Sequence, residues 1–218
     1  MKTLLMKHGV KEPFFGVKIE YLKSIEKKVK KDYQLAKDLY ATGNADAMYL
    51  AGLIADDEKM TKADLNAWLQ KAESKNIIEY TVPWVAAGSK QGFGLALEWI
   101  DSKDDKISSA GWNTLGHILA LKPDSELDIN LIKKLLSRIA KTIHSSPNRT
   151  RYTMNGFIIA VGSYVAALTN DAVATAKQNG LIMVDMGDTS CKVPDAIVYI
   201  DKVKARGSLG KKKKTVKC

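Results

Sequence analysis

Apolar residues recur at helical spacing along nearly the whole chain. Leu65, Trp68, Leu69 and Ala72, for example, are separated by intervals that place them on one face of a helix. No stretch of alternating apolar and polar residues is long enough to predict a strand. The pattern therefore predicts an all-α protein.

Turn-forming and capping residues divide this pattern into helices. Thr61 and Asp64 have the spacing of a capping box, Asp128 is placed to cap a later helix, and Pro83 would kink a helix or stand in its first turn. Helices of roughly 10 to 18 residues with connections of about 2 to 8 residues imply antiparallel neighbours. Pairs of about 40 residues have the period of HEAT or armadillo repeats. We therefore predict a HEAT/armadillo-like α-α superhelix of stacked antiparallel helix pairs, with an irregular helical bundle as the alternative.

The basic residues gather at the two ends of the sequence. The formal charge is +10; residues 1–31 contain nine lysines against three glutamates, and residues 192–218 contain eight lysines and one arginine against two aspartates. Such clusters concentrate polyanions and release counterions from a phosphate backbone, which favours DNA as a partner. Basic ends that only aid solubility are the alternative.

The domain organisation and location follow from the same composition. We expect one helical domain over residues 1–205 and, because glycines accompany the lysine run 211–214, a flexible basic tail over residues 206–218. No apolar run approaches the roughly 20 residues of a membrane-spanning helix. The first ten residues lack a small-residue cleavage site. These features predict a cytoplasmic protein.

The sequence carries few signs of metal or cofactor chemistry. Cys191 and Cys218 have no spacing for a disulfide framework or a zinc site, and His8, His117 and His144 stand far apart. Phosphate loops, nucleophile elbows and metalloprotease motifs are absent from the sequence. We therefore expect no metal and no cofactor.

Two polar clusters interrupt the apolar pattern. Glu79 and Tyr80 stand in an otherwise apolar stretch before Pro83, which suggests a partly buried carboxylate, although the sequence alone favours a surface-facing or helix-capping glutamate. Ser145, Ser146 and Asn148 precede a long helix, where free N–H groups and the charges of Arg149 and Arg151 could seat a phosphate. Routine capping and solvation are the alternative for this second cluster.

Both clusters lie in stretches that resemble the bacterial HEAT-like DNA alkylation repair glycosylases (AlkD-like). The stretch Lys75 to Pro83 aligns with a family segment that ends in a proline. The turn at His144 to Ser146, followed by Gly156 and Phe157, resembles the family's polar turn that precedes a glycine and an aromatic residue. The order of the predicted helices matches the family from about Phe14 to Val184.

The resemblance implies a function and assigns roles to residues. Glu79 takes the position of the family's active-site aspartate, and Lys75 and Phe157 take those of its two tryptophans. The chain would then be an alkylpurine DNA glycosylase that excises N3- or N7-alkylated purines, with Glu79 stabilising the cationic sugar. Contacts to the lesion through aromatic faces would come from Trp84, Trp112, Tyr152 and Phe157. Contacts to the DNA backbone would come from Lys75, Ser145, Ser146, Asn148, Arg149 and Arg151.

The expected partner is double-stranded DNA, bound by a monomer. The family places an arginine in the intervening helix that has no equivalent near Gly111 to Leu115, so the catalytic residues are only partly present. A non-catalytic HEAT-repeat protein that binds nucleic acid, or a protein-binding scaffold, is therefore the alternative. Aromatic residues in helices are usually core residues, and this is the favoured interpretation of Trp68, Trp84, Trp99 and Trp112.

Overall fold

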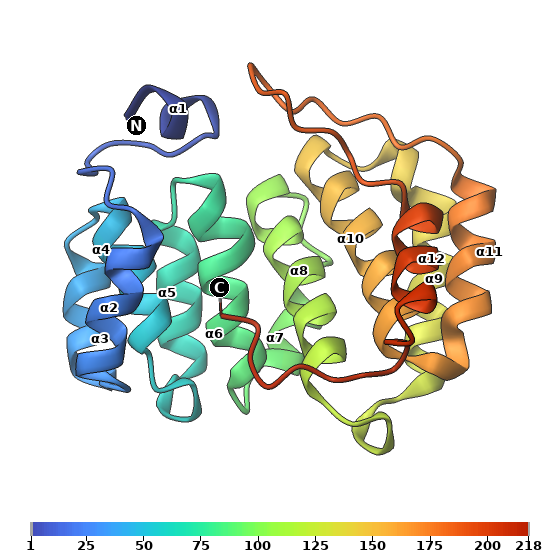
Figure 1. Cartoon of the computed structure of the whole chain (residues 1–218), viewed down its shortest axis with the longest axis horizontal. Helices are drawn as coiled ribbons and strands as arrows, with labels where there is room; N and C mark the ends of the chain where they lie inside the picture. Colours follow the sequence, from blue (N-terminus) through green and yellow to red (C-terminus); the bar gives the residue numbers. More distant parts are fainter. Residues whose placement is uncertain (1, 218) are drawn as a thin grey trace.

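The computed structural model describes residues 2–217, and within them every regular element is helical (Figure 1). The helices are α1 (Lys2–Lys7), α2 (Ile19–Val29), α3 (Tyr33–Ala41), α4 (Ala45–Ile54), α5 (Lys62–Lys71), α6 (Val82–Gly88), α7 (Gly92–Trp99), α8 (Asp105–Leu121), α9 (Ile129–Thr142), α10 (Asn148–Tyr164), α11 (Thr169–Asn179) and α12 (Ala196–Ala205). A π-helical turn, Ile77–Thr81, leads directly into α6. The predicted all-α class is confirmed.

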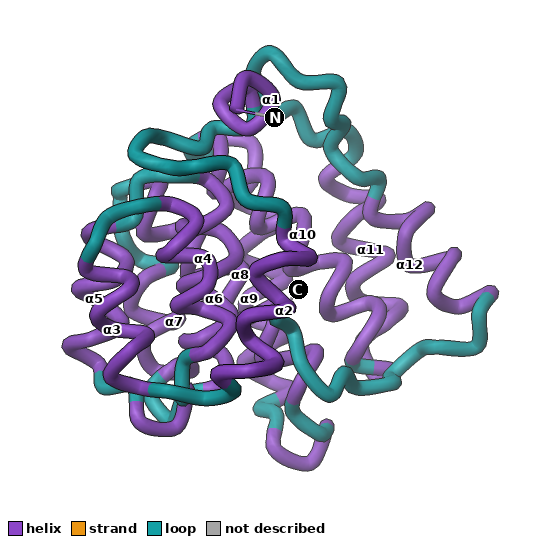
Figure 2. The backbone as a smooth tube through the Cα atoms, turned by 60° about the vertical axis from the view of Figure 1, so that its left-hand side comes forward, coloured by secondary structure: helices purple, strands orange, loops and turns teal. Residues whose placement is uncertain are grey.

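The helices pair and stack as repeats. The pairs are α3 with α4, α5 with α6, α7 with α8, α9 with α10, and α11 with α12. The second helix of each pair contacts the second helix of the next, so that α4, α6, α8, α10 and α12 form one continuous layer. Helix α2 packs on α4 at one end of this layer, and α12 closes the other (Figures 1 and 2). We call the surface of α6, α8 and α10 between α2 and α12 the inner face.

Several helix starts follow from local sequence. Thr61 and Asp64 form the predicted capping box at the start of α5, and the Asp128 carboxylate accepts the N–H of Leu131 at the start of α9. In α9 the residues Ile132, Leu135, Leu136 and Ile139 are buried at the expected helical spacing. These signals lie within a few residues of the helix starts, so the sequence alone could place them.

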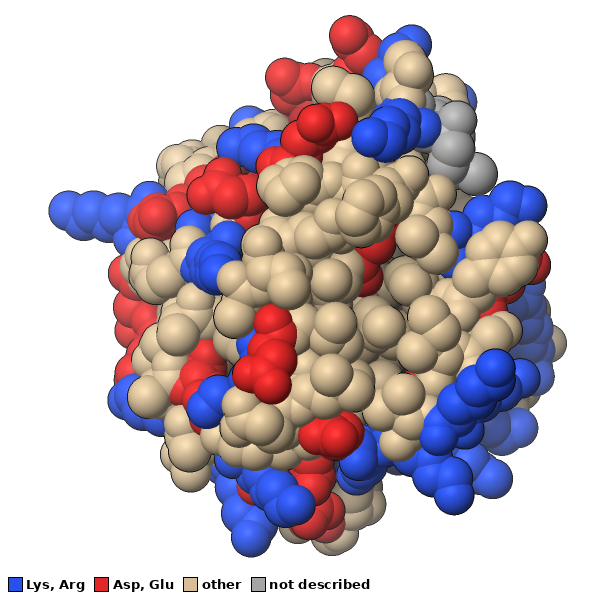
Figure 3. Space-filling view, turned by 90° about the vertical axis from the view of Figure 1, so that its left-hand side faces the viewer, with Lys and Arg blue, Asp and Glu red and all other residues tan. Residues whose placement is uncertain are grey.

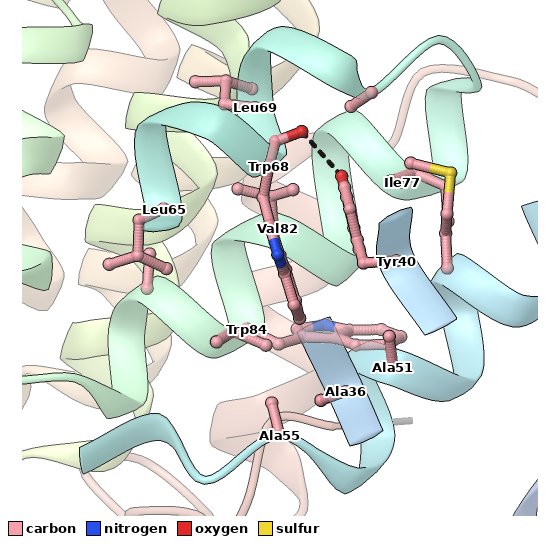
Figure 4. Packing of buried hydrophobic residues seen from close by; sticks show 14 of the residues in the cluster. Ala36, Tyr40, Ala51, Ala55, Leu65, Trp68, Leu69, Ile77, Val82 and Trp84 are labelled. Carbon is pink, nitrogen blue, oxygen red and sulfur yellow. Dashed lines mark hydrogen bonds between the residues drawn. The ribbon is translucent and has the colours of Figure 1, made fainter. Parts of the chain in front are cut away.

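The four tryptophans lie in the core of the stack. The Tyr40 and Trp68 rings are stacked with centroids 4.0 Å apart, and the Tyr40 hydroxyl donates to the Trp68 carbonyl at 2.7 Å (Figure 4). Trp84 is 3% exposed beneath the same cluster, and Trp112 and Phe157, which are 0% and 1% exposed, pack edge to face between α8 and α10. The structure thus corrects the predicted lesion contacts of Trp84, Trp112 and Phe157, because apolar packing encloses these rings.

The C-terminal segment is packed rather than free. Residues 208–217 run across the C-terminal ends of α10 and α8 toward the end of α4, as the dark red loop of Figure 1 shows. Carbonyl groups in the last turn of a helix lack helical donors, and lysines interact favourably with that end of the helix dipole. The pairs are Gly210 N with Ser163 O, Lys213 N with Ala120 O, Lys212 Nζ with Leu119 O and Tyr164 O, and Lys217 Nζ with Ala55 O. The lysines expected in a flexible tail are therefore partly used in capping.

No single helix of the described residues is long and apolar enough to cross a membrane. The pair α10 and α11 passes a length and composition test together but is bent by 116°. Eleven residues of α10 are buried in the stack, which accounts for its apolar composition.

Candidate nucleic-acid interface and the buried Glu79 site

Glu79 lies in the π-helical turn that precedes α6. The Val82 N–H donates to the Ile77 carbonyl, one residue farther back than in an α-helix. In an α-helical register the donor to the Glu79 carbonyl would be the N–H of residue 83, which Pro83 lacks, and the Asn113 side chain of α8 donates to this carbonyl at 2.6 Å. The turn therefore directs the Glu79 side chain between α8 and α10. In other proteins, π turns of this kind are frequently found at functional sites.

The Glu79 carboxylate is neutralised by an arginine. Arg149 Nε donates to Oε1 at 2.6 Å and Nη2 donates to Oε2 at 2.7 Å, while Glu79 is only 2% exposed. The guanidinium also lies 4.3 Å from the centroid of the Tyr152 ring. Burial alone would lower the pKa of Arg149, but the hydrogen bonds and charge of Glu79 outweigh it and raise the pKa. The two side chains form a bidentate ion pair in which both carboxylate oxygens accept hydrogen bonds.

A second carboxylate occupies the start of α10. Asp105 Oδ2 accepts the N–H of Arg149 at 2.9 Å, and Oδ1 accepts both the N–H and the hydroxyl of Thr150, at 2.7 and 2.8 Å. These are the free N–H groups that the sequence suggested for a phosphate. The structure therefore corrects the predicted phosphate seat, because a carboxylate of this chain already fills it.

Three of the other predicted backbone contacts at this turn have partners of their own. The hydroxyls of Ser145 and Ser146 donate to the Thr142 carbonyl, at 3.0 and 2.9 Å. Asn148 exchanges two hydrogen bonds with the main chain of Asp185. Arg151 is half-buried, with a buried Nε that has no hydrogen-bond partner. The structure brings Lys75, Glu79, Arg149 and Tyr152 together. Ser145, Ser146, Asn148 and Arg151 lie apart from that group.

Two distant segments cover the Glu79 site. A cavity of about 250 Å³ is lined by Lys75, Glu79, Tyr80, Arg149 and Tyr152 together with residues of the N-terminal segment and of the connection between α11 and α12. The two covering segments meet where His8 Nδ1 of the N-terminal segment lies 4.0 Å from Cys191 Sγ of the connection. The Gly9 carbonyl of the N-terminal segment accepts the Lys75 N–H. Burial, followed by the charges of Tyr152 and Glu79, raises the pKa of Tyr80. Of the four predicted lesion contacts, only Tyr152 lines this cavity.

Asn113 and Asp105 were missed by the sequence reasoning. Each acts on residues that stand 34 to 45 positions away in the chain, so no local motif could identify them. Among residues 2–217 no group of His, Cys, Asp and Glu side chains is placed to hold a metal ion.

Exposed basic residues surround the inner face. Both basic ends of the sequence reach it, since α2 flanks one end, α12 the other, and the C-terminal segment one edge (Figure 1). Figure 3, which views the end of the stack, shows Lys and Arg gathered at the lower right, on the side that faces the viewer in Figure 1. The exposed residues of these three elements include Lys27, Lys28, Lys30, Lys202, Lys204, Arg206, Lys211, Lys213 and Lys214.

Residues 2–199 match the model of a protein family described as "DNA alkylation repair enzyme". The chain belongs to this family. Two uncharacterized proteins, from Listeria innocua serovar 6a and Listeria monocytogenes serovar 1/2a, are 35% and 34% identical to it over 195 residues, which cover 88% of this chain and 84% of each relative. The resemblance inferred from Lys75 to Pro83 and His144 to Phe157 is thereby confirmed at the level of the family.

A solved structure shares the whole fold of this DNA alkylation repair family member. It superposes with a TM-score of 0.92 at 36% identity and covers 100% of this chain and 92% of its own. It is described as "a new family of proteins related to the HEAT-like repeat DNA glycosylases with affinity for branched DNA structures". The predicted HEAT-like stack is confirmed by this similarity.

Proposed function

We propose that the protein binds DNA, with a preference for branched DNA, along its inner face, and that it does not excise alkylated bases. The DNA partner is supported by the family and by the relative at 36% identity, whose description names affinity for branched DNA. Further support comes from α2, α12 and the C-terminal segment, which bring both basic ends of the sequence to one face. Lysines placed around a surface attract phosphates without reading sequence.

The absence of excision is supported by one observation above all, the ion pair between Glu79 and Arg149. A carboxylate that stabilises a cationic sugar must face the sugar with its charge uncompensated. Here both oxygens of Glu79 accept hydrogen bonds from Arg149, and the side chain is almost fully buried. Two of the rings expected to hold the cationic base, Trp84 and Trp112, are core residues. In a site built in this way, the charge of the Glu79 carboxylate stabilises the fold and does not face a substrate.

Two assays on the full chain test the proposal. In the first, the affinity for a four-way junction, a three-way junction and a linear duplex of matched length is measured at several salt concentrations. We expect tighter binding to the branched forms and a linear fall of log affinity with log salt. Equal affinity for all three forms would contradict the preference, and absence of binding at low salt would contradict the DNA function.

The second assay measures release of 7-methylguanine from methylated DNA, with Glu79→Gln as the matched variant. We expect no release above the uncatalysed background from either protein. Release by the parent that is lost in Glu79→Gln would show that the carboxylate is catalytic and would overturn the non-catalytic assignment.

A further inference from the structure

A second cavity lies on the inner face, away from Glu79. It occupies about 160 Å³ between the C-terminal halves of α8 and α10. Its floor is narrow because Gly116 and Ala160 face each other, and a Cβ at Gly116 would lie 3.5 Å from that of Ala160. Tyr199 of α12 and Lys213 of the C-terminal segment stand at its rim. Elements from three parts of the sequence thus build one small cavity.

Two residues that line this cavity, His117 and Ser163, each carry a buried polar atom that has no hydrogen-bond partner. The Nε2 atom of His117 and the Oγ atom of Ser163 are buried and make no hydrogen bond. Ser163 is 2% exposed, so bulk water does not solvate its hydroxyl. Buried polar atoms in folded proteins nearly always have a hydrogen-bond partner. The cavity therefore calls for an occupant that hydrogen-bonds to both groups.

The charges around the cavity favour a negative occupant. Among the described residues, no carboxylate lines the cavity. Lys213 does line it, and this lysine forms no ion pair with a described residue. The Lys213 main chain is fixed by its hydrogen bond to Ala120, and the ammonium lies 5.7 Å from the centroid of the Tyr164 ring. The carbonyls that end α8 and α10 are already paired with Lys212. Lys212 thus neutralises the negative ends of these two helices, and the Lys213 ammonium remains available to bind a ligand.

We propose that this cavity seats one phosphate group, held by the Lys213 ammonium, the Ser163 hydroxyl and the His117 imidazole. Phosphate oxygens are acceptors, and all three groups can donate. The proposal rests on the proposed function in one respect: on the inner face, the group would be a backbone phosphate of bound DNA. Free inorganic phosphate has the same chemistry, and the test below separates the two sources.

His117 reports directly on the occupant. Burial, followed by the charge of Lys213, lowers its pKa to about 4, so the ring is neutral at pH 7. The other titratable groups that line the cavity are Tyr164 of α10 and Tyr199 of α12. A phosphate beside the ring stabilises the imidazolium and raises its pKa.

The experiment follows the His117 ring nitrogens by NMR in the full chain labelled at histidine, during separate titrations with a DNA junction and with inorganic phosphate. DNA affinity is measured in parallel for Lys213→Gln, for Ser163→Ala, and for Lys134→Gln as a control that removes one exposed charge from α9. We expect the ring signals to move with DNA. Lys213→Gln should weaken binding roughly tenfold and reduce the slope of log affinity against log salt by about 0.9, with Lys134→Gln unchanged.

The outcomes separate this proposal from the proposed function. If the parent binds DNA but the His117 signals stay still and Lys213→Gln behaves like Lys134→Gln, the phosphate seat is wrong and DNA binding stands. If DNA does not bind but inorganic phosphate moves the His117 signals in the parent and not in Ser163→Ala, the seat stands as a free-anion site and DNA binding is wrong. If neither titrant moves them, the cavity is filled by water and the seat is wrong.

Discussion

At the scale of single residues, the Glu79–Arg149 pair determines both the stability and the chemistry of the site. Two charges removed from water compensate each other only while both are present. Neighbouring side chains also contact the pair: Arg149 lies against the Tyr152 ring, and its Nη1 lies 3.6 Å from the Met186 sulfur. Either charge alone would be buried without a partner.

We therefore predict that Arg149→Met destabilises the protein by about 3–5 kcal/mol, because the Glu79 carboxylate is left buried and unpaired. The double variant Glu79→Leu, Arg149→Met should recover most of that loss, since no charge remains. Chemical denaturation measures both. Lys62→Met is the control: the pair of Lys62 with Glu98 is exposed and should be worth less than about 1 kcal/mol. A double variant as unstable as Arg149→Met would show that the lost packing, not the charge, matters.

His117 gives a second prediction, on pH. Its pKa is about 4 when folded, against an ordinary value of 6.5, so the unfolded chain binds the proton first as the pH falls. Its contribution to stability is complete above pH 6.5 and is lost progressively toward pH 4, by on the order of 3 kcal/mol. The pH dependence of the unfolding free energy should be shallower in His117→Gln across that window. Identical profiles would show that the ring is solvated.

At the scale of elements, the π turn before α6 depends on two residues that compensate for each other. Pro83 lacks the N–H that would serve the Glu79 carbonyl in an α-helical register, and Asn113 supplies a donor from α8. Asn113→Ala should cost about 1–3 kcal/mol because the carbonyl is left without a donor. Adding Pro83→Ala should reduce that loss, since residue 83 then carries an N–H. Additive losses in denaturation, with no coupling between the two positions, would contradict this account.

Helix starts and buried stripes could be predicted because their signals are local. The capping box at Thr61 and the cap at Asp128 lie within one turn of the helices that they begin. The site could be predicted only in part. Glu79 stood out as a carboxylate among apolar residues, but the sequence gives no sign that Arg149 pairs with it across 70 positions. Trp112 was ambiguous for a related reason: helical spacing places a ring on a face without showing what covers that face.

At the scale of the whole molecule, the C-terminal segment links the two ends of the stack. Lys217 donates to the Ala55 carbonyl and pairs with Asp57 at 2.7 Å, and both side chains are mostly buried. Burial raises the pKa of Asp57, and the nearby Lys217 opposes that shift. The segment thus carries a structural charge, Lys217, as well as exposed lysines at the edge of the inner face.

Ending the chain at Gly210 should therefore have two effects. The loss of the Lys217 partner should destabilise the stack by about 3 kcal/mol and lower Tm by roughly 6–12 °C. The loss of the exposed lysines should also flatten the salt dependence of DNA affinity. Lys217→Met is the matched control: it should reproduce part of the fall in Tm, because Lys212 still donates to the carbonyls of Leu119 and Tyr164, with little change in the salt slope. A truncated chain with the parent's Tm would mean that the segment does not hold the stack together.

The contact between Lys217 and Asp57 joins residues 160 positions apart, and this separation bears on how the protein folds. An open array of repeats behaves as a one-dimensional chain, in which end repeats fray and fold independently of each other. A segment that returns from the last repeat to the first couples those ends, so that they should open together. Contacts of such long sequence separation also form late, because the entropy of closing the loop is lost before they stabilise anything. In native-state hydrogen exchange, the amides of α4 and α12 should therefore report one shared opening free energy in the parent and two different ones after truncation.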